Sequence, residues 1–115
     1  MGKIRRRPPK VADVLALVRK HLDDGTYLDT RHATERERQR RITLPEILNV
    51  LRRGYHESRK DEFKDLYDAW NYAIRGKTVD GRQLRVCVSF DASGMLLITA
   101  IDLNADTRNR RGNDT

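Results

Sequence analysis

The sequence is poor in the residues that many functional classes require. Its single cysteine, Cys87, excludes an internal disulfide, and we expect a buried thiol within a strand. The aromatic content of 6% is too low for a base-stacking sheet of the RNA-recognition kind. No apolar run is long enough to cross a membrane, and no signal-peptide-like apolar segment follows the basic N-terminus. We therefore expect a cytoplasmic protein that has no membrane partner.

Motifs for common catalytic centres are also lacking. The histidines His21, His32 and His56 are scattered, and their spacing matches no zinc site or two-metal site. The chain has neither a glycine-rich phosphate loop nor a serine-centred nucleophile turn. The sequence thus predicts neither a bound metal nor a cofactor, and leaves any chemistry to its charged side chains.

Charge is abundant, with 36% charged residues and a formal net charge of +7. Residues 1–10 carry five basic side chains and no acidic one. Such an arm attracts the phosphates of a nucleic acid, although it can also serve only as a solubilising tail. The predicted organisation is a basic arm over 1–10, a single domain over 11–103 and a disordered polar tail over 104–115.

Hydrophobic periodicity predicts helices in the first half of the chain. Apolar residues recur at helical spacing over 11–24. A capping box over 43–46 precedes a second helix over 44–53. Between them we expect a short strand over 27–30 and a charged helix from about residue 30 to residue 40.

The second half of the chain has the alternation and turn signals of a sheet. Strands are predicted over 55–59, 69–77, 82–90 and 95–102, whereas 60–68 fits either a loop or a short helix. The fold class is therefore α+β. We expect the N-terminal helices to pack on one face of a small antiparallel sheet, made of a three-strand C-terminal meander and one or two short strands.

Alternation also predicts how the first two strands of the meander pair. A two-residue turn at 80–81 would pair Arg75 with Val86 and mix polar and apolar side chains on each face. A three-residue loop over 79–81 instead pairs Arg75 with Arg85 and keeps one face apolar. We therefore expect the three-residue loop.

Two arginines directly opposite each other repel unless an anion lies between them. In a functional interpretation, Arg75 and Arg85 hold a phosphodiester and stabilise the charge of its transition state. In a structural interpretation, Glu57 or Asp102 neutralises the pair. His32 is a candidate general acid or base for metal-free RNA cleavage, and its structural alternative is helix capping or packing on the sheet.

The order of elements resembles the MqsR-like toxins, which belong to the RelE/barnase-type group of small ribonucleases. The chain also resembles a bacterial domain family of that group with the pattern His-x-x-x-Arg-x-x-x-Arg-x-Ile. This pattern is present as His32, Arg36, Arg40 and Ile42, and residues 76–86 resemble the hairpin of the same family. The resemblance covers about residues 10–103.

The resemblance implies a metal-independent endoribonuclease that cleaves mRNA and is neutralised by a cognate antitoxin protein, as in type II toxin–antitoxin pairs. It places active-site groups near Lys60, Tyr72, Gln83 and Arg85, although periodicity assigns Tyr72 to the apolar face. With the residue-level candidates, the predicted catalytic residues are His32, Lys60, Tyr72, Arg75, Gln83 and Arg85. The predicted nucleic-acid-binding residues are Arg5, Arg6, Arg7, Arg36, Arg40 and Lys77.

One departure from these toxins bears on catalysis. They often have a basic residue at the end of the last strand, where this chain has Asp102, and an acid there could instead pair with Arg85. One alternative function is therefore a non-catalytic nucleic-acid-binding or adaptor domain of the same fold. Another is an interaction module whose acidic segment 57–68 meets a basic partner.

Overall fold

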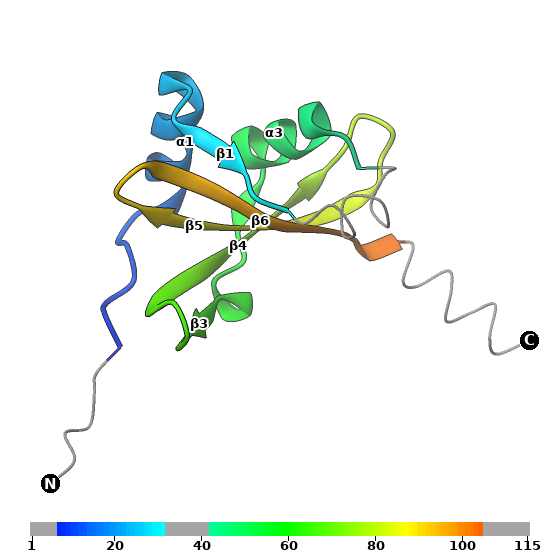
Figure 1. Ribbon diagram of the computed structural model, residues 1–115. Coiled ribbons are helices and arrows are strands. Elements are labelled where there is room, and N and C mark those ends of the chain that lie inside the picture. Colours follow the sequence, from blue (N-terminus) through cyan, green and yellow to red (C-terminus); the bar gives the residue numbers. More distant parts are fainter. Residues whose placement is uncertain (1–6, 32–41, 105–115) are drawn as a thin grey trace, which may run out of the picture.

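The computed structural model describes residues 7–31 and 42–104 (Figure 1). The helices are α1 (Val14–Asp24), α3 (Leu44–Arg53) and the 3-10 helix η1 (Ser58–Lys60). The strands are β1 (Tyr27–Asp29), β2 (Tyr55–His56), β3 (Glu62–Lys64), β4 (Ala69–Lys77), β5 (Gln83–Asp91) and β6 (Gly94–Asp102). This is the α+β fold that the sequence predicts. The charged helix expected to reach residue 40 lies, from residue 32 onward, outside the described residues.

The six strands form one sheet in the order β1-β6-β5-β4-β2, and β3 pairs with the beginning of β4. The sheet is mixed rather than purely antiparallel, because β1 runs parallel to β6. No hairpin joins these two strands, so no turn imposes an antiparallel orientation on them. The three long strands form the antiparallel meander that was predicted.

The predicted register of the meander is confirmed. Arg75 pairs with Arg85 across β4 and β5. The Thr78 N–H donates to the Arg82 carbonyl at 2.8 Å, which leaves residues 79–81 as a three-residue loop. Gly81 has a φ of 87°, the left-handed conformation that glycine adopts without strain. Turn chemistry and alternation therefore agree on one pairing.

Two predicted boundaries were wrong by three residues. Helix α1 begins at Val14 and not at residue 11, because the Asp13 carboxylate caps it by accepting from the Ala16 N–H. Strand β2 is only two residues long, since the chain leaves β4 at Glu57 to form η1. Segment 60–68, for which a loop and a short helix were both left open, contains strand β3 and a turn. The capping box in front of α3 is present as predicted.

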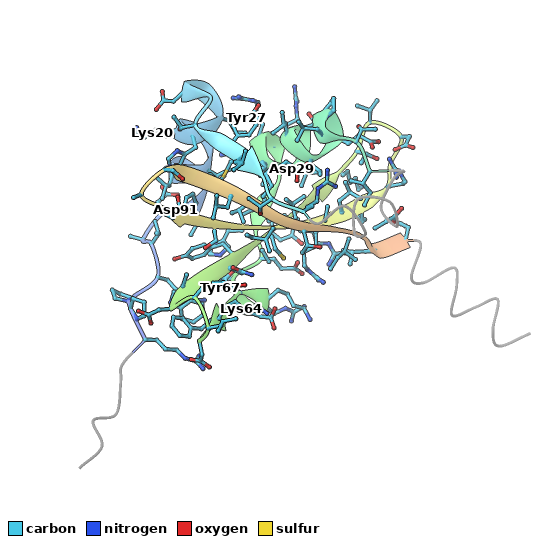
Figure 2. The ribbon with its side chains drawn as sticks, in the orientation of Figure 1. Lys20, Tyr27, Asp29, Lys64, Tyr67 and Asp91 are labelled. Carbon is cyan, nitrogen blue, oxygen red and sulfur yellow. The ribbon has the colours of Figure 1, made fainter. Side chains whose placement is uncertain are left out.

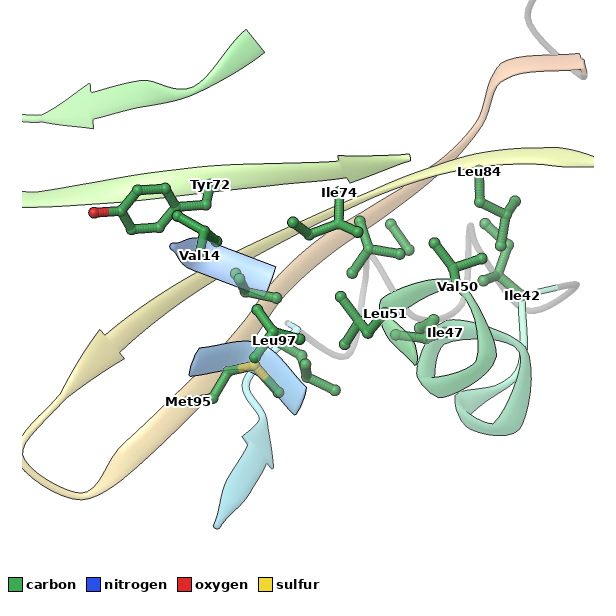
Figure 3. Close-up of a cluster of buried hydrophobic side chains, with 14 residues drawn as sticks. Val14, Ile42, Ile47, Val50, Leu51, Tyr72, Ile74, Leu84, Met95 and Leu97 are labelled. Atoms are coloured by element: carbon green, nitrogen blue, oxygen red, sulfur yellow. The ribbon is translucent and has the colours of Figure 1, made fainter. Parts of the chain in front are cut away.

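Helices α1 and α3 lie on the same side of the sheet (Figure 1) and bury one apolar face of it (Figure 3). The buried cluster joins residues of both helices to residues of the three long strands: Val14, Val18, Ile42, Ile47, Val50, Leu51, Tyr72, Ile74, Leu84, Val86, Val88, Met95, Leu97 and Ala100. Burial of this apolar surface is the main stabilising contribution to the fold. Among the described residues, no helix has the length and apolar character needed to span a membrane.

The end of α3 lies against β4 through a glycine contact. A Cβ atom on Gly54 would lie 2.4 Å from the Arg75 carbonyl oxygen, which is closer than real Cβ atoms approach. The missing side chain therefore lets the chain pass directly from α3 into β2 beside Arg75. This close approach determines where the next residues, Tyr55 to Glu57, lie on the sheet.

The side of the sheet that faces away from α1 and α3 is the open face. Alternation assigns to it the side chains that do not point at the helices. In β4 and β5 these are Asn71, Ala73, Arg75, Lys77, Gln83, Arg85, Cys87 and Ser89. Cys87 is half-buried, and burial raises the pKa of its thiol.

Candidate functional site

Three neighbouring strands place an aromatic ring and two guanidinium groups in one row on the open face. Tyr55 of β2 pairs with Arg75 of β4, and Arg75 pairs with Arg85 of β5. Neighbouring strands lie about 4.8 Å apart, so the row is short enough to contact a single nucleotide. Tyr55, Arg75 and Arg85 together form the cross-strand row.

Glu57 is the anion that lies between the two arginines. Its N–H donates to the Ala73 carbonyl at 2.8 Å, which places it one row away from the cross-strand row. Because Ala73 has a small side chain, the Glu57 carboxylate reaches both guanidiniums. It accepts from Arg85 Nε at 2.8 Å and Nη2 at 3.2 Å, and from Arg75 Nη1 at 3.3 Å. Glu57 is 6% exposed.

This arrangement resolves which acid neutralises the arginine pair. Glu57 does so, as the structural interpretation of the sequence proposed. Asp102 instead lies opposite Leu84, and its carboxylate is 3.6 Å from Arg82 Nη1. Of the two alternatives, the pairing of Asp102 with Arg85 was therefore wrong, because alternation directs the two side chains to opposite faces.

The site keeps a net positive charge and unused hydrogen-bond donors. Two guanidiniums and one carboxylate leave a charge of +1, and the hydrogen bond from Arg85 holds the pKa of Glu57 below its ordinary value despite burial. Among the described residues, Arg75 Nη2 and Arg85 Nη1 have no hydrogen-bond acceptor. The arginine side chains are 32% and 18% exposed, so an anion can reach them.

Two further predicted residues lie beside this cluster. The Gln83 side-chain oxygen accepts from Arg75 Nε at 3.3 Å, and the Gln83 N–H donates to Asn104 Oδ1 at 2.6 Å. Lys77 is paired with Gln83 across the strands and is exposed. The structure therefore brings together Arg75, Gln83 and Arg85, with Lys77 next to them.

The other predicted site residues are not part of the cluster. Tyr72 lies on the helix-covered face and is 4% exposed. Alternation within β4 directs its side chain to the face opposite to that of Arg75. Lys60 is exposed at the end of η1, and its backbone N–H donates to the Glu57 carbonyl at 2.9 Å. Arg7 lies over the rings of Phe63 and Trp70. The remaining candidates lie outside the described residues: Arg5, Arg6, His32, Arg36 and Arg40.

A buried carboxylate anchors the segment that carries Glu57. The side chain of Asp61 is fully buried and accepts from the Ala73 N–H at 2.9 Å. It also lies 2.8 Å from His56 Nε2 and 3.0 Å from Lys10 Nζ. These contacts connect both ends of segment 57–61 to β4 and to the N-terminal arm, so they restrict where Glu57 can lie.

The last residues of the predicted basic arm are fixed to this part of the sheet. The Trp70 indole N–H donates to the Pro8 carbonyl at 2.8 Å, and Lys10 Nζ lies 4.8 Å from the centre of the Trp70 ring. The Val11 N–H donates to the Tyr72 hydroxyl at 3.0 Å. Residues 7–11 therefore form a strap along β3 and β4, and they are not only a charged extension.

Sequence reasoning missed Tyr55 and Asp61. Tyr55 lies in the strand predicted over 55–59, and Asp61 lies in segment 60–68, for which a loop and a short helix were both left open. Extending the alternation back from Glu57 would have placed Tyr55 on the same face, but its partner in β4 could not be predicted. That pairing depends on the Gly54 contact with Arg75, which is made in the folded chain.

The acid sensitivity of the fold tests the ion pairs of Glu57. Its pKa is lowered in the folded state by the hydrogen bond from Arg85, so its stabilising contribution is fully present above the unfolded pKa of about 4.3. The contribution is lost as the pH falls through the lower, folded pKa. We expect the urea midpoint of the wild-type protein to fall more steeply on acidification than that of Glu57→Gln. Equal slopes would contradict this, since Glu46, with its own lowered pKa, is common to both proteins.

The comparison with known families places the chain in one of them. The family model of the domain of unknown function DUF4258 matches residues 30–102. The chain belongs to the DUF4258 family. The matched range contains the cross-strand row, Glu57 and Asp61, whereas the strap and α1 lie before it. No curated protein and no solved structure matches the chain.

The DUF4258 domain offers a chemistry based on arginine and carboxylate groups. Among residues 7–31 and 42–104, no group of three or more His, Cys, Asp or Glu side chains is placed to hold a metal ion. The open face instead offers two cations for a phosphate and one ionised carboxylate as a proton acceptor. These groups can bind a phosphodiester, and they include the base that its cleavage requires.

Proposed function

We propose that this DUF4258 protein is a metal-independent endoribonuclease that cleaves mRNA. The observation that carries the proposal is the position of Glu57, an ionised carboxylate in contact with both Arg75 and Arg85 on the open face. A base beside two phosphate-binding cations is the combination that cleavage of RNA by its own 2′-hydroxyl requires. In this proposal the arginines supply the positive charge that a metal ion supplies in other nucleases.

The proposed reaction is an attack of the ribose 2′-oxygen on the adjacent phosphorus. Glu57 accepts the proton of the 2′-hydroxyl as the new P–O bond forms. The bond to the 5′-oxygen of the next nucleotide breaks, and that oxygen takes a proton from a general acid. The products are a 2′,3′-cyclic phosphate and a free 5′-hydroxyl. The two guanidiniums stabilise the extra negative charge of the pentacoordinate transition state.

The electrostatics of the cluster are consistent with this role of Glu57. In the free protein, the hydrogen bond from Arg85 keeps the carboxylate ionised by lowering its pKa. A bound phosphate shares both guanidiniums with Glu57 and adds a second negative charge nearby. Both effects raise the pKa of Glu57 and make it a stronger base when substrate is present. His32, the sequence's candidate for acid–base chemistry, is the proposed general acid.

The biological role in the proposal rests on the resemblance to the MqsR-like and RelE-type toxins. We propose that the protein is the toxin of a type II toxin–antitoxin pair and acts on mRNA in the cytoplasm. A cognate antitoxin protein would bind it and block the open face. The basic arm and Lys77 would add sequence-independent contacts to RNA phosphates.

A second function is favoured by the same contacts. Glu57 already occupies three of the N–H donors of the two arginines, which is the arrangement of a purely structural ion pair. A domain of this kind would bind nucleic acid through its remaining donors and its basic arm without cleaving it. This non-catalytic nucleic-acid-binding or adaptor role is the alternative to the endoribonuclease.

The two functions are distinguished by incubating the purified protein with a structured mRNA in EDTA. The endoribonuclease is expected to produce fragments with 2′,3′-cyclic phosphate and 5′-hydroxyl ends, and to leave a 2′-O-methylated RNA of the same sequence intact. Salt-sensitive binding without fragments would overturn the catalytic proposal and support the adaptor. Fragments that disappear in EDTA would overturn metal independence.

A further inference from the structure

Tyr55 is an aromatic side chain that the fold leaves uncovered beside the two arginines. It is 55% exposed, although a tyrosine in a strand can normally bury its ring. Its strand, β2, is the last in the sheet order, so the ring lies at an edge of the open face. Cross-strand pairing with Arg75 directs the Tyr55 side chain to the same face as the guanidiniums.

The spacing of the cross-strand row fits the chemistry of one nucleotide. Tyr55 is one strand away from Arg75 and two strands away from Arg85, with about 4.8 Å between neighbouring strands. In a nucleotide, one sugar separates the flat base from the charged phosphate. A phosphate bound by the arginines would therefore place an adjacent base over the Tyr55 ring. Gln83 and Lys77 lie in the next row, and not between Tyr55 and the arginines.

From this juxtaposition we propose that Tyr55 is a stacking subsite for an unpaired nucleobase, which makes single-stranded RNA the substrate class. The inference rests on the proposed function insofar as RNA is the ligand of the open face, but it holds equally for the non-catalytic alternative. An aromatic ring stacks on a base only when the base has left its own helix. In a duplex both faces of the base are covered by neighbouring pairs, so a paired strand offers nothing to Tyr55.

The ring and the arginines have separable roles in this subsite. The guanidiniums bind the backbone of any RNA strand, whereas Tyr55 contributes only when a free base is present. Stacking tolerates every base, because each has a π-face, so Tyr55 selects unpaired nucleotides without selecting a sequence. The row therefore predicts a preference for loops and unpaired segments of a structured mRNA.

The test compares two oligomers of equal length and phosphate count by fluorescence anisotropy. One is a 2′-O-methylated single-stranded RNA, which lacks the attacking hydroxyl and stays intact. The other is its abasic sugar–phosphate counterpart. We expect Tyr55→Ala to weaken binding of the base-bearing oligomer about 5-fold to 150-fold, and to leave binding of the abasic oligomer unchanged. Tyr55→Phe, which keeps the ring, is expected to bind both oligomers like the wild-type protein.

Tyr67 provides a matched control for the loss of an exposed ring. It is 75% exposed in the turn between β3 and β4 (Figure 2). That turn leads into the beginning of β4, whereas Arg75 lies near the end of the strand. Tyr67→Ala is therefore expected to leave the binding of both oligomers unchanged. Circular dichroism of each variant establishes that the comparison is made between folded proteins.

The outcomes separate this inference from the proposed catalysis. Dependence on Tyr55 only for the base-bearing oligomer supports the subsite, whether or not unmodified RNA is cleaved in EDTA. Equal losses for both oligomers, or no loss for either, would overturn the subsite even if cleavage is observed. A duplex of the same sequence bound as tightly as the single strand would also overturn it.

Discussion

The Arg85→Ala variant is expected to cleave RNA about 10²-fold to 10³-fold more slowly than the wild-type protein in EDTA, which is the usual effect of removing one transition-state donor. Arg85 donates to both oxygens of Glu57 and keeps one terminal nitrogen for the phosphate. Its loss therefore removes a cation from the transition state and an orienting contact from the base. Single-turnover rates with a defined oligoribonucleotide measure the effect directly.

Two further arginine variants make this result specific. Arg52→Ala removes an arginine from an exposed ion pair on α3, where Arg52 Nη1 lies 3.1 Å from Asp23, and is expected to cleave at the wild-type rate. Arg85→Lys keeps the charge but loses the two-pronged guanidinium, so an intermediate rate is expected. If the wild-type protein cleaves RNA and Arg85→Ala cleaves it equally well, the open face is not the active site.

Glu57→Gln is expected to change cleavage and binding in opposite directions. The amide cannot accept the proton of the 2′-hydroxyl, so the single-turnover rate falls by about 10²-fold to 10⁴-fold. The same substitution raises the net charge of the cluster from +1 to +2, so a non-cleavable RNA binds more tightly. Rates and anisotropy measured on the same preparation reveal both effects. In the adaptor alternative, only the tighter binding is expected.

A second carboxylate controls for the change in overall charge. Glu62 is exposed on β3 and lies 3.3 Å from Lys64, outside the arginine cluster. Glu62→Gln therefore alters the charge of the protein by the same amount without touching the row, and we expect a near wild-type rate. Cleavage by Glu57→Gln at the wild-type rate would refute the proton-acceptor role. The glutamine in Glu57→Gln fills the same space as the glutamate, so we expect this variant to lower the free energy of unfolding by only about 1–3 kcal/mol.

The sequence predicted the pairing of Arg75 with Arg85 because two local signals agreed there. Alternation defined an apolar face on each strand, and of the two loops that Gly81 allows, only the three-residue loop keeps those faces aligned. The capping box of α3 was predictable for a similar reason, since all of its parts lie within four residues. Local periodicity and turn chemistry are sufficient for elements of this kind.

The positions of Tyr55 and Glu57 depend on contacts between distant parts of the chain. The strand predicted over 55–59 breaks after two residues, because the buried Asp61 side chain accepts the Ala73 N–H that a continued strand would use, and residues 58–60 form η1 instead. The parallel pairing of β1 with β6 joins elements separated by most of the chain. Neither arrangement leaves a periodic signal in the sequence, so periodicity alone could not predict them.

The strap over residues 7–11 also has a consequence for the order of folding. Its residues are made before their partners, which lie far along the chain: Lys10 contacts Ser58, and Pro8 accepts from Trp70. During synthesis the arm therefore stays unattached until β4 has left the ribosome, because contacts of such long sequence separation close late. A nascent chain would expose its basic arm before Glu57 is anchored, so the arm's attraction for anions would precede the assembly of the Glu57–arginine cluster.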